Sequence, residues 1–291
     1  STVQLTATPA DGFRFAEWHG DCEGNDNPLT VGIEAPLTCQ AHFDTQIVSP
    51  PEEQNPSIAS GELALCPTSG TVNEACDAKG QTLTDLTVEA QGSVANGVIE
   101  GHLINRGWVS NLTIQADSVV EGGIVSGFIT NHGTMVDFEF RGATITGGTL
   151  SGTIINNSPI DGSIKEVHLA ADTYLSGGQL AGPISGNPEA PAVVENVTIA
   201  GDSVLTGLII GEQVTVLEDT VIFEDILLAP NSNLSGGTVQ GYLIGDPQAP
   251  ARLENLTITA DSVLDHVIIG DNVILAEGVK LGEGVQGVTL P

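Results

Sequence analysis

The stretch NLTITADSVLDHVIIG at residues 255–270 decides the fold, because close variants of it recur along the chain. NVTIAGDSVLTGLIIG stands at 196–211, and NLTIQADSVVEGGIVSG begins at Asn111. By subtraction, the steps between successive copies are 26, 26, 29, 30, 29 and 30 residues. A period of this length predicts a repeated supersecondary unit. The seven copies begin at Asp85, Asn111, Asp137, Glu166, Asn196, Asp225 and Asn255.

Each copy opens with apolar residues at alternate positions, such as Leu112 and Ile114 or Val197 and Ile199. Alternation with period two predicts a β-strand with one buried face. A glycine then follows in every copy, which predicts a corner where the backbone needs a dihedral angle that a side chain disfavours. These predicted corner glycines are Gly101, Gly127, Gly152, Gly182, Gly211, Gly241 and Gly270.

Short strands separated by such corners predict an all-β protein, a single-stranded β-solenoid of about seven coils of 26–30 residues. Aliphatic residues at about every sixth position, as in Ile269, Leu275 and Leu281, resemble the pattern of left-handed β-helices, but a unit of 26–30 residues favours a right-handed coil. Each coil buries its apolar face only by stacking on its neighbours, so the core is expected to be a column of aliphatic side chains. The composition fits, since 40% of the residues are hydrophobic, only 4% are aromatic and 36 are glycine. At about 4.8 Å per coil, the predicted rod would be roughly 30 Å long.

Two related segments, GNPEAPAVVEN at 186–196 and GDPQAPARLEN at 245–255, are separated by two steps of the repeat. Their proline and alanine content predicts loops in place of paired strands, expected to bulge from one side of the rod.

The chain carries 7 basic and 37 acidic residues, a formal net charge of −30. Nucleic acid and anionic membrane surfaces are therefore poor partners. No run approaches the roughly 18 apolar residues of a membrane-spanning helix, so no direct membrane insertion is expected. The excess of carboxylates makes divalent cations plausible ligands, although an acidic surface also serves solubility.

One acidic position recurs within the repeat and forms the candidate metal site. If the units stack as coils, carboxylates on adjacent coils, such as Asp172 and Asp202, would lie roughly 5 Å apart, and calcium could bridge them. The alternative is that Asp before Ser or Thr makes a turn by bonding to its own backbone. The candidate ligands are Asp117, Asp172, Asp202 and Asp261, with Asn231 at the same register.

No motif predicts catalysis. The histidines His102, His132, His168 and His266 fall at different offsets in their units, and the nucleophile motif GxSxG is absent. Polysaccharide-degrading enzymes with β-helix folds need basic residues near an acidic sugar or paired carboxylates at the glycosidic bond. The few basic residues here lie at unrelated offsets, so the chain is predicted not to be an enzyme.

The four cysteines fall into two close pairs, Cys22 with Cys39 and Cys66 with Cys76. Three connectivities are possible, and position in the chain favours the sequential one. Disulfides predict an oxidising compartment and an extracellular or cell-surface location. The chain begins directly on the strand-like STVQLTATP, as expected for a processed or excised piece of a secreted precursor.

Residues 1–44 depart from the repeat. They contain a recognisable set of short motifs. These are LTATP at 5–9, Gly12-Phe13, Trp18 with Gly20-Asp21-Cys22, and Cys39 with Ala41 and Phe43. This set resembles the small bacterial surface-repeat domain related to the internalin B-repeat. The resemblance implies a β module of exported bacterial proteins and no activity. Members of that family usually carry another strand before LTATP, so the expectation is either that the chain is truncated there or that such a strand comes from elsewhere.

The predicted organisation is a β domain at 1–45, a proline-rich linker at 46–62 and a solenoid at 63–291 whose first coil is sealed by Cys66 and Cys76. No cap is predicted for the C-terminal GVKLGEGVQGVTLP at 278–291. An open end predicts head-to-tail self-association into a surface filament or stalk. The alternatives are that neighbouring domains of a longer surface protein cover this end, or that the chain is an adhesin presenting its loops.

Overall fold

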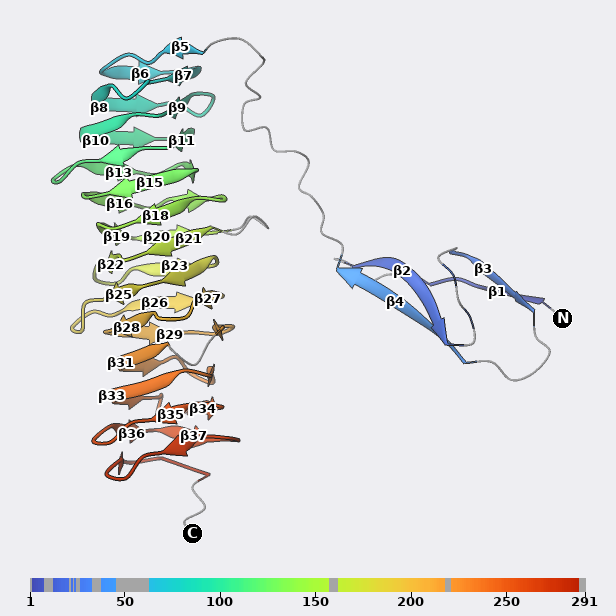
Figure 1. The fold of residues 1–291 in the computed structure, drawn as a ribbon. Helices are drawn as coiled ribbons and strands as arrows, with labels where there is room; N and C mark the ends of the chain where they lie inside the picture. Colours follow the sequence, from blue (N-terminus) through green and yellow to red (C-terminus); the bar gives the residue numbers. More distant parts are fainter. Residues whose placement is uncertain are drawn as a thin grey trace. The chain divides into compact units, whose positions relative to one another are not determined.

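A computed structural model describes residues 2–7, 13–20, 22, 24, 27–32, 38–45, 63–156, 162–217 and 221–287. The chain divides into two compact units, Ser1–Gln54 and Asn55–Pro291. Every described element is a β-strand (Figure 1). The predicted linker at 46–62 lies outside the described residues.

The described residues of the N-terminal unit form two antiparallel strand pairs. β1 (Thr2–Leu5) pairs with β3 (Leu29–Gly32), and β2 (Phe13–Gly20) pairs with β4 (Cys39–Thr45). Trp18 and Cys22 are buried in a small apolar cluster. Cys22 and Cys39 form a disulfide, in the pairing that the sequence predicts.

The second unit is a β-solenoid in which the strands pair in parallel with strands one turn away, as Figure 1 shows. The predicted solenoid fold is confirmed, but the predicted coil length is wrong. Strand partners are closer in sequence than the repeated phrase is long, since Val119 pairs with Thr134 and Thr153 pairs with Tyr174. The solenoid has about 12 turns and not seven, so it spans on the order of 55 Å at about 4.8 Å per turn. The hand of the coil stays a prediction.

The repeated phrase and the turn have different lengths. Three strands complete one turn, because β12 pairs with β15, β13 with β16 and β14 with β17. The phrase advances five strands, since the copy at Asn111 enters β12 and the copies at Asp137 and Glu166 enter β17 and β22. Each copy is therefore displaced by one and two-thirds turns from the previous one. Consecutive copies lie on different faces of the three-sided coil.

We name the three faces A, B and C. Face A is built from β12 (Thr113–Ile114), β15 (Phe128–Asn131), β18 (Thr144–Thr146), β21 (Ser163–Lys165), β24 (Gln179–Ala181), β27 (Thr198–Ile199), β30 (Thr215–Val216), β32 (Asn233–Ser235), β34 (Ala251–Glu254) and β37 (Val267–Ile269). Face B is built from β6 (Gly70–Val72), β13 (Val119–Glu121), β16 (Thr134–Val136), β19 (Thr149–Ser151), β22 (His168–Leu169), β25 (Pro183–Ser185), β28 (Val204–Thr206), β35 (Thr257–Ile258) and β38 (Ile274–Leu275).

Face C is built from β5 (Ala64–Leu65), β7 (Ala75–Asp77), β9 (Ser93–Ala95), β11 (Trp108–Ser110), β14 (Ile124–Ser126), β17 (Glu139–Phe140), β20 (Thr153–Ile155), β23 (Tyr174–Ser176), β26 (Ala192–Glu195), β29 (Leu208–Ile210), β36 (Val263–Asp265) and β39 (Lys280–Leu281). Four longer strands bend through a corner and serve two faces. β8 (Thr82–Val88) and β10 (Val98–Asn105) join faces A and B, whereas β31 (Ile222–Leu228) and β33 (Thr238–Ile244) join faces B and C.

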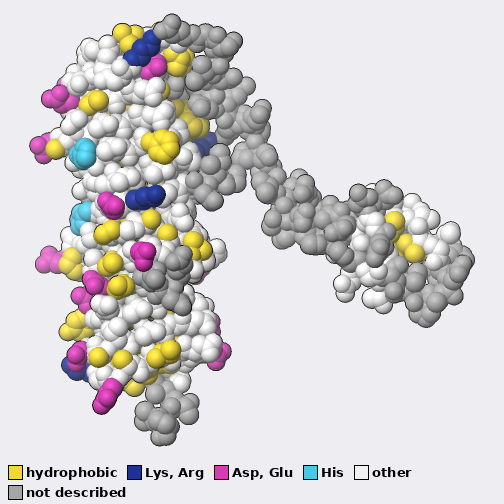
Figure 2. Space-filling view, viewed as in Figure 1, with side chains coloured by type: hydrophobic (Ala, Val, Ile, Leu, Met, Phe, Trp, Pro, Cys, Tyr) yellow, Lys and Arg dark blue, Asp and Glu magenta, His cyan; other side chains and the backbone are white. Residues whose placement is uncertain are grey.

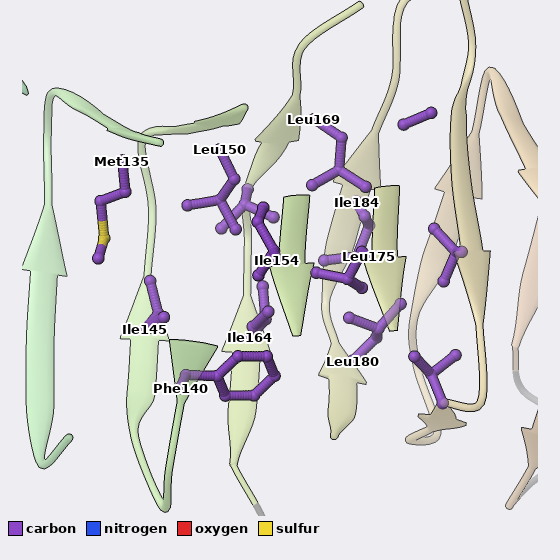
Figure 3. Close-up of a cluster of buried hydrophobic side chains, with 14 of the residues drawn as sticks. Met135, Phe140, Ile145, Leu150, Ile154, Ile164, Leu169, Leu175, Leu180 and Ile184 are labelled. Carbon is purple, nitrogen blue, oxygen red and sulfur yellow. The ribbon is translucent and has the colours of Figure 1, made fainter. Parts of the chain in front are cut away.

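The middle residue of a typical strand points inward, and these side chains stack into ladders. Figure 3 shows Met135, Leu150, Leu169 and Ile184 in one such ladder, all fully buried. Each ladder repeats once per turn, so the core is a continuous aliphatic column with two fully buried aromatic residues, Phe140 and Phe223. The few aromatic residues of the sequence follow from this narrow interior.

Candidate functional site

The first residue of each repeated phrase lies at a corner of the coil. All seven have a left-handed backbone, with φ between +47° and +54°. Asn and Asp tolerate this conformation better than most residues, which explains why six of the seven are Asn or Asp. Four of these side chains accept a hydrogen bond from a backbone N–H of the next turn, whereas Asn196 and Asn255 donate to Ser176 and Ser235 on the previous turn. Asn111 Oδ1, for example, accepts a hydrogen bond from the backbone N–H of Phe128 at 3.0 Å, and Asp137 Oδ1 accepts one from Thr153 at 2.7 Å.

Five of the predicted corner glycines lie on the next turn, directly against these side chains. Gly101, Gly127, Gly152, Gly182 and Gly241 have φ between +65° and +87°. A Cβ atom at Gly127 would lie 2.4 Å from Asn111 Oδ1. In these five copies, the number of residues between the first residue of the phrase and its glycine is therefore set by a contact between the two on consecutive turns.

The prediction of a corner conformation is wrong for Gly211 and Gly270. Neither has a positive φ, and the left-handed residues of those corners are Gln213 (φ +53°) and Asn272 (φ +57°). The left-handed position thus lies further along the chain at these two corners. The glycines instead permit close packing, since a Cβ atom at Gly211 would lie 2.8 Å from Cβ of Glu195.

The structure separates the candidate metal ligands. Asp117 and Asp202 precede β13 and β28 on face B, five turns apart, and Asp172 and Asp261 precede β23 and β36 on face C, also five turns apart. Five turns amount to roughly 24 Å. The prediction that Asp172 and Asp202 stack on adjacent coils is therefore wrong, because the phrase is longer than a turn. Within the described residues, no group of three or more His, Cys, Asp or Glu side chains could hold a metal ion.

These aspartates instead form turns. Each has a left-handed backbone, with φ between +56° and +64°, and the Ser or Thr that follows is buried. Ser203 Oγ, for example, donates a hydrogen bond to the carbonyl of Ala200 at 2.7 Å. The recurrent Asp-Ser and Asp-Thr pairs thus lie in turns, as the alternative interpretation of the sequence predicts, but the hydrogen bonds of Thr173 and Ser203 that close these turns come from the hydroxyl that follows the aspartate.

Calcium is expected to leave the melting temperature of the protein within about 1 °C of its value in magnesium at equal ionic strength, because no stacked carboxylates face one another among the candidate ligands. Thermal unfolding followed by circular dichroism, with EDTA as the reference, measures this. A rise of several degrees specific to calcium would contradict the expectation.

Two buried asparagines at corners were not identified from the sequence. Asn105 and Asn131 are 2% and 1% exposed, and their Oδ1 atoms accept hydrogen bonds from Gly107 and Gly133, both at 3.0 Å. Asn105 Nδ2 also donates to the carbonyls of Gly122 and Ile124 on the next turn. The two asparagines are separated by the same step as the first two copies of the phrase, and this periodicity is the signal that could have revealed them.

The two ends of the solenoid differ. At the N-terminal end, Cys66 and Cys76 form a disulfide and are 3% and 4% exposed, so their sulfur atoms belong to the first layer of the core. At the C-terminal end, Leu281 pairs in register with Leu264 and continues its inward column. Leu264 is fully buried, whereas Leu281 is 42% exposed. The last described turn therefore leaves the end of the apolar column uncovered.

The two proline-containing loops extend from different corners. Residues 186–191 connect β25 on face B to β26 on face C, whereas residues 245–250 connect β33 on face C to β34 on face A. The prediction that both bulge from one side of the rod is therefore wrong, since two phrases amount to three and one-third turns. Both loops are internally braced, with Asn187 accepting from the N–H of Glu189 at 3.0 Å and Asp246 accepting from that of Gln248 at 2.7 Å.

The acidic side chains are distributed along the solenoid and recur along its left edge in Figure 2, where Lys and Arg are few. The exposed His102 contacts Glu121 (3.2 Å) and His168 contacts Ser185 (3.0 Å), one turn away in each case. The described residues include no helix that could span a membrane.

Residues 1–47 match the family described as the divergent InlB B-repeat domain, which confirms the resemblance of the N-terminal residues. No curated protein matches the sequence significantly. Among solved structures, a TibC-catalysed hyperglycosylated fragment of TibA is similar over 76% of this chain and 94% of that chain, at 15% identity and a TM-score of 0.30. A likeness of that strength carries no argument about function.

Proposed function

We propose that the chain is an exported structural protein of a bacterial surface, a stalk or filament subunit whose solenoids join end to end. The observation that carries the proposal is the uncovered C-terminal turn, where Leu281 continues a buried column but is 42% exposed. Leu275, in the same turn, pairs in register with the fully buried Ile258 and is itself only partly buried. The match of residues 1–47 to a surface-repeat domain and the two disulfides support export.

A solenoid turn buries its apolar side chains only when another turn covers them. The edge strands β38 and β39 each pair, among the described residues, with one strand on their N-terminal side. A second solenoid stacked on this turn would cover Leu275 and Leu281 and complete the parallel strand pairing. Contact between two different ends does not close on itself, so repetition generates a filament. The competing occupant is further sequence of a longer surface protein.

Leu281→Glu is expected to abolish end-to-end assembly without unfolding the solenoid, because the side chain is already part-exposed and the new charge would face the partner's column. The measurement is electron microscopy of the purified chain at rising concentration, together with sedimentation velocity. Wild-type protein should form filaments one solenoid wide, and the variant should remain as single rods.

Leu217→Glu serves as the matched control, because Leu217 is 55% exposed and lies away from the C-terminal turn. It adds the same charge and should leave filaments intact. Single rods of the wild-type chain at every concentration would overturn end-to-end assembly and leave a stalk segment of a longer protein.

The braced loops at 186–191 and 245–250 favour a second candidate function, adhesion. They present Pro188, Glu189, Pro247 and Gln248 to solvent at fixed positions. An adhesin would lose attachment when these loops are replaced by short glycine-containing corners while end-to-end assembly is retained.

A further inference from the structure

The first turn of the solenoid, residues 64–74, contributes few side chains to the core. Cys66 and Val72 are buried, and every other residue of this turn is exposed. The second turn, residues 75–92, buries five apolar side chains, which are those of Cys76, Ala78, Leu83, Leu86 and Val88. The apolar surface that the first turn buries is therefore small against the conformational entropy that its ordering costs.

The strands of the first turn are paired on one side only, among the residues that the structure describes. β5 pairs with β7, and β6 pairs with β8. β7 and β8 belong to the second turn, and each has a further partner in the third turn, β9 and β10. A terminal turn contacts one neighbour where an inner turn contacts two, so it needs the least free energy to open.

A disulfide joins this weakly held turn to the second turn. Cys66 directly follows β5 and Cys76 lies in β7, at a sequence separation of 10 residues. The bond ties the two ends of the loop together when the turn opens, so opening gains less conformational entropy than it would in a free chain. The covalent bond thus compensates for the small apolar surface of the first turn.

We infer that residues 64–74 are an end cap held closed by the disulfide between Cys66 and Cys76. Cutting this bond opens the cap as one unit, and the rest of the solenoid stays folded. The second turn remains in place because β7 and β8 keep their hydrogen bonds to β9 and β10.

The cap covers fully buried side chains of the second turn. Gly70 pairs in register with Leu86, and Val72 pairs with Val88. Leu86 and Val88 are almost inaccessible to solvent while the cap is closed. An open cap would expose them at the N-terminal end of the column, much as Leu281 is exposed at the C-terminal end.

The chemistry that opens the cap is thiol–disulfide exchange with a dithiol reductant. One thiolate of the reductant attacks a sulfur of the disulfide, forms a mixed disulfide and releases the other cysteine as a thiolate. The second thiol of the reductant then displaces the remaining cysteine, which leaves the reductant as a cyclic disulfide and Cys66 and Cys76 reduced. The N-terminal end of the rod is therefore completed only in a compartment where disulfides form.

The test is hydrogen exchange at single backbone amides of the full chain carrying Cys22→Ala and Cys39→Ala. In this variant the disulfide of the cap is the only one left, and the solenoid is a separate compact unit from the substituted residues. The oxidised chain is compared with the same chain after reduction by dithiothreitol, with free thiols counted to establish that the bond is cut.

Three amides report on the cap. The N–H of Cys66 donates from the first turn to the second, and the N–H groups of Thr84 and Glu89 donate to carbonyls of the first turn. Reduction should speed exchange at these three amides by about 100-fold, because opening is then no longer limited by the closed loop. Exchange at Thr113, which donates to Gly97 in an inner turn, should not change.

The chain carrying Cys66→Ala and Cys76→Ala is the matched control. It should exchange rapidly at Thr84 and Glu89 both with and without dithiothreitol, and a response to the reductant would overturn the inference. Equal exchange of the oxidised and reduced chains would mean that packing alone holds the cap closed. Equal acceleration at Thr113 would mean that the solenoid opens as a whole. Either result would overturn the inference, as would a failure of reoxidation to restore slow exchange.

Discussion

Phe140→Ala is expected to lower the free energy of unfolding of the solenoid by about 3–5 kcal/mol, because it removes a fully buried aromatic ring from a narrow column. The ring fills space that two nearby glycines leave open. A Cβ atom at Gly162 would lie 2.5 Å from Phe140 Cδ2, and one at Gly178 would lie 2.8 Å from Cε2. The surrounding turns are held by backbone hydrogen bonds on both sides, so they cannot collapse into the cavity.

Chemical denaturation followed by circular dichroism measures the loss. Phe128→Ala is the matched control, since it deletes the same kind of side chain at a position that is 74% exposed. We expect the control to change stability by less than about 0.5 kcal/mol. Equal denaturation midpoints for the two variants would mean that the ring of Phe140 is not in the core.

Gly123→Ala is expected to lower the free energy of unfolding by about 2–4 kcal/mol, through two effects that act together. The residue has φ +66°, which disfavours any side chain, and its Cβ atom would lie 2.2 Å from Nδ2 of Asn105. Asn105 is 2% exposed and cannot move away without breaking its hydrogen bonds to the backbone of Gly107, Gly122 and Ile124.

Gly80→Ala separates the two effects. Gly80 has φ +80°, but no atom lies within 4 Å of the Cβ position. The control should therefore lose only the conformational part, about 1 kcal/mol. The difference between the two variants, measured by thermal and chemical unfolding, gives the contribution of the buried Asn105 network. If both variants lose the same stability, that network does not constrain the corner.

The strands and corners of the solenoid could be predicted from the sequence, because each depends on residues that are close together in the chain. Alternation at Leu112 and Ile114 or Val197 and Ile199 predicts a strand wherever that strand lies, and all four residues are buried. The left-handed corners at Asn111 and Asn196 follow from the conformational tolerance of asparagine. The turn at Asp202 and Ser203 is also local. The sequence predicted it as the alternative to a metal site.

The prediction of a metal site was wrong because it depended on which residues lie on adjacent turns, and this is not a local property of the sequence. Asp172 and Asp202 occupy equivalent places in successive phrases, and treating the phrase as one turn placed them side by side. The pairing of β23 with β26 and of β25 with β28 puts them on different faces. Gly211 and Gly270 show a milder form of the same problem, since their corners are shifted along the chain relative to the other five.

The sequence by itself determined that the chain forms short parallel strands around an aliphatic column, with Asn, Asp and Gly at the corners and disulfides within each unit. Only the tertiary structure decided how many strands complete a turn. The coil closes when the rotations of the backbone at three corners add up to a full turn. The spacing of residues in the sequence does not give the size of these rotations. That closure separates the aspartates by five turns, aligns Tyr174, Val193, Ile209, Leu227 and Ile244 on one outer face, and leaves Leu281 at the uncovered end of a column that buries Leu264.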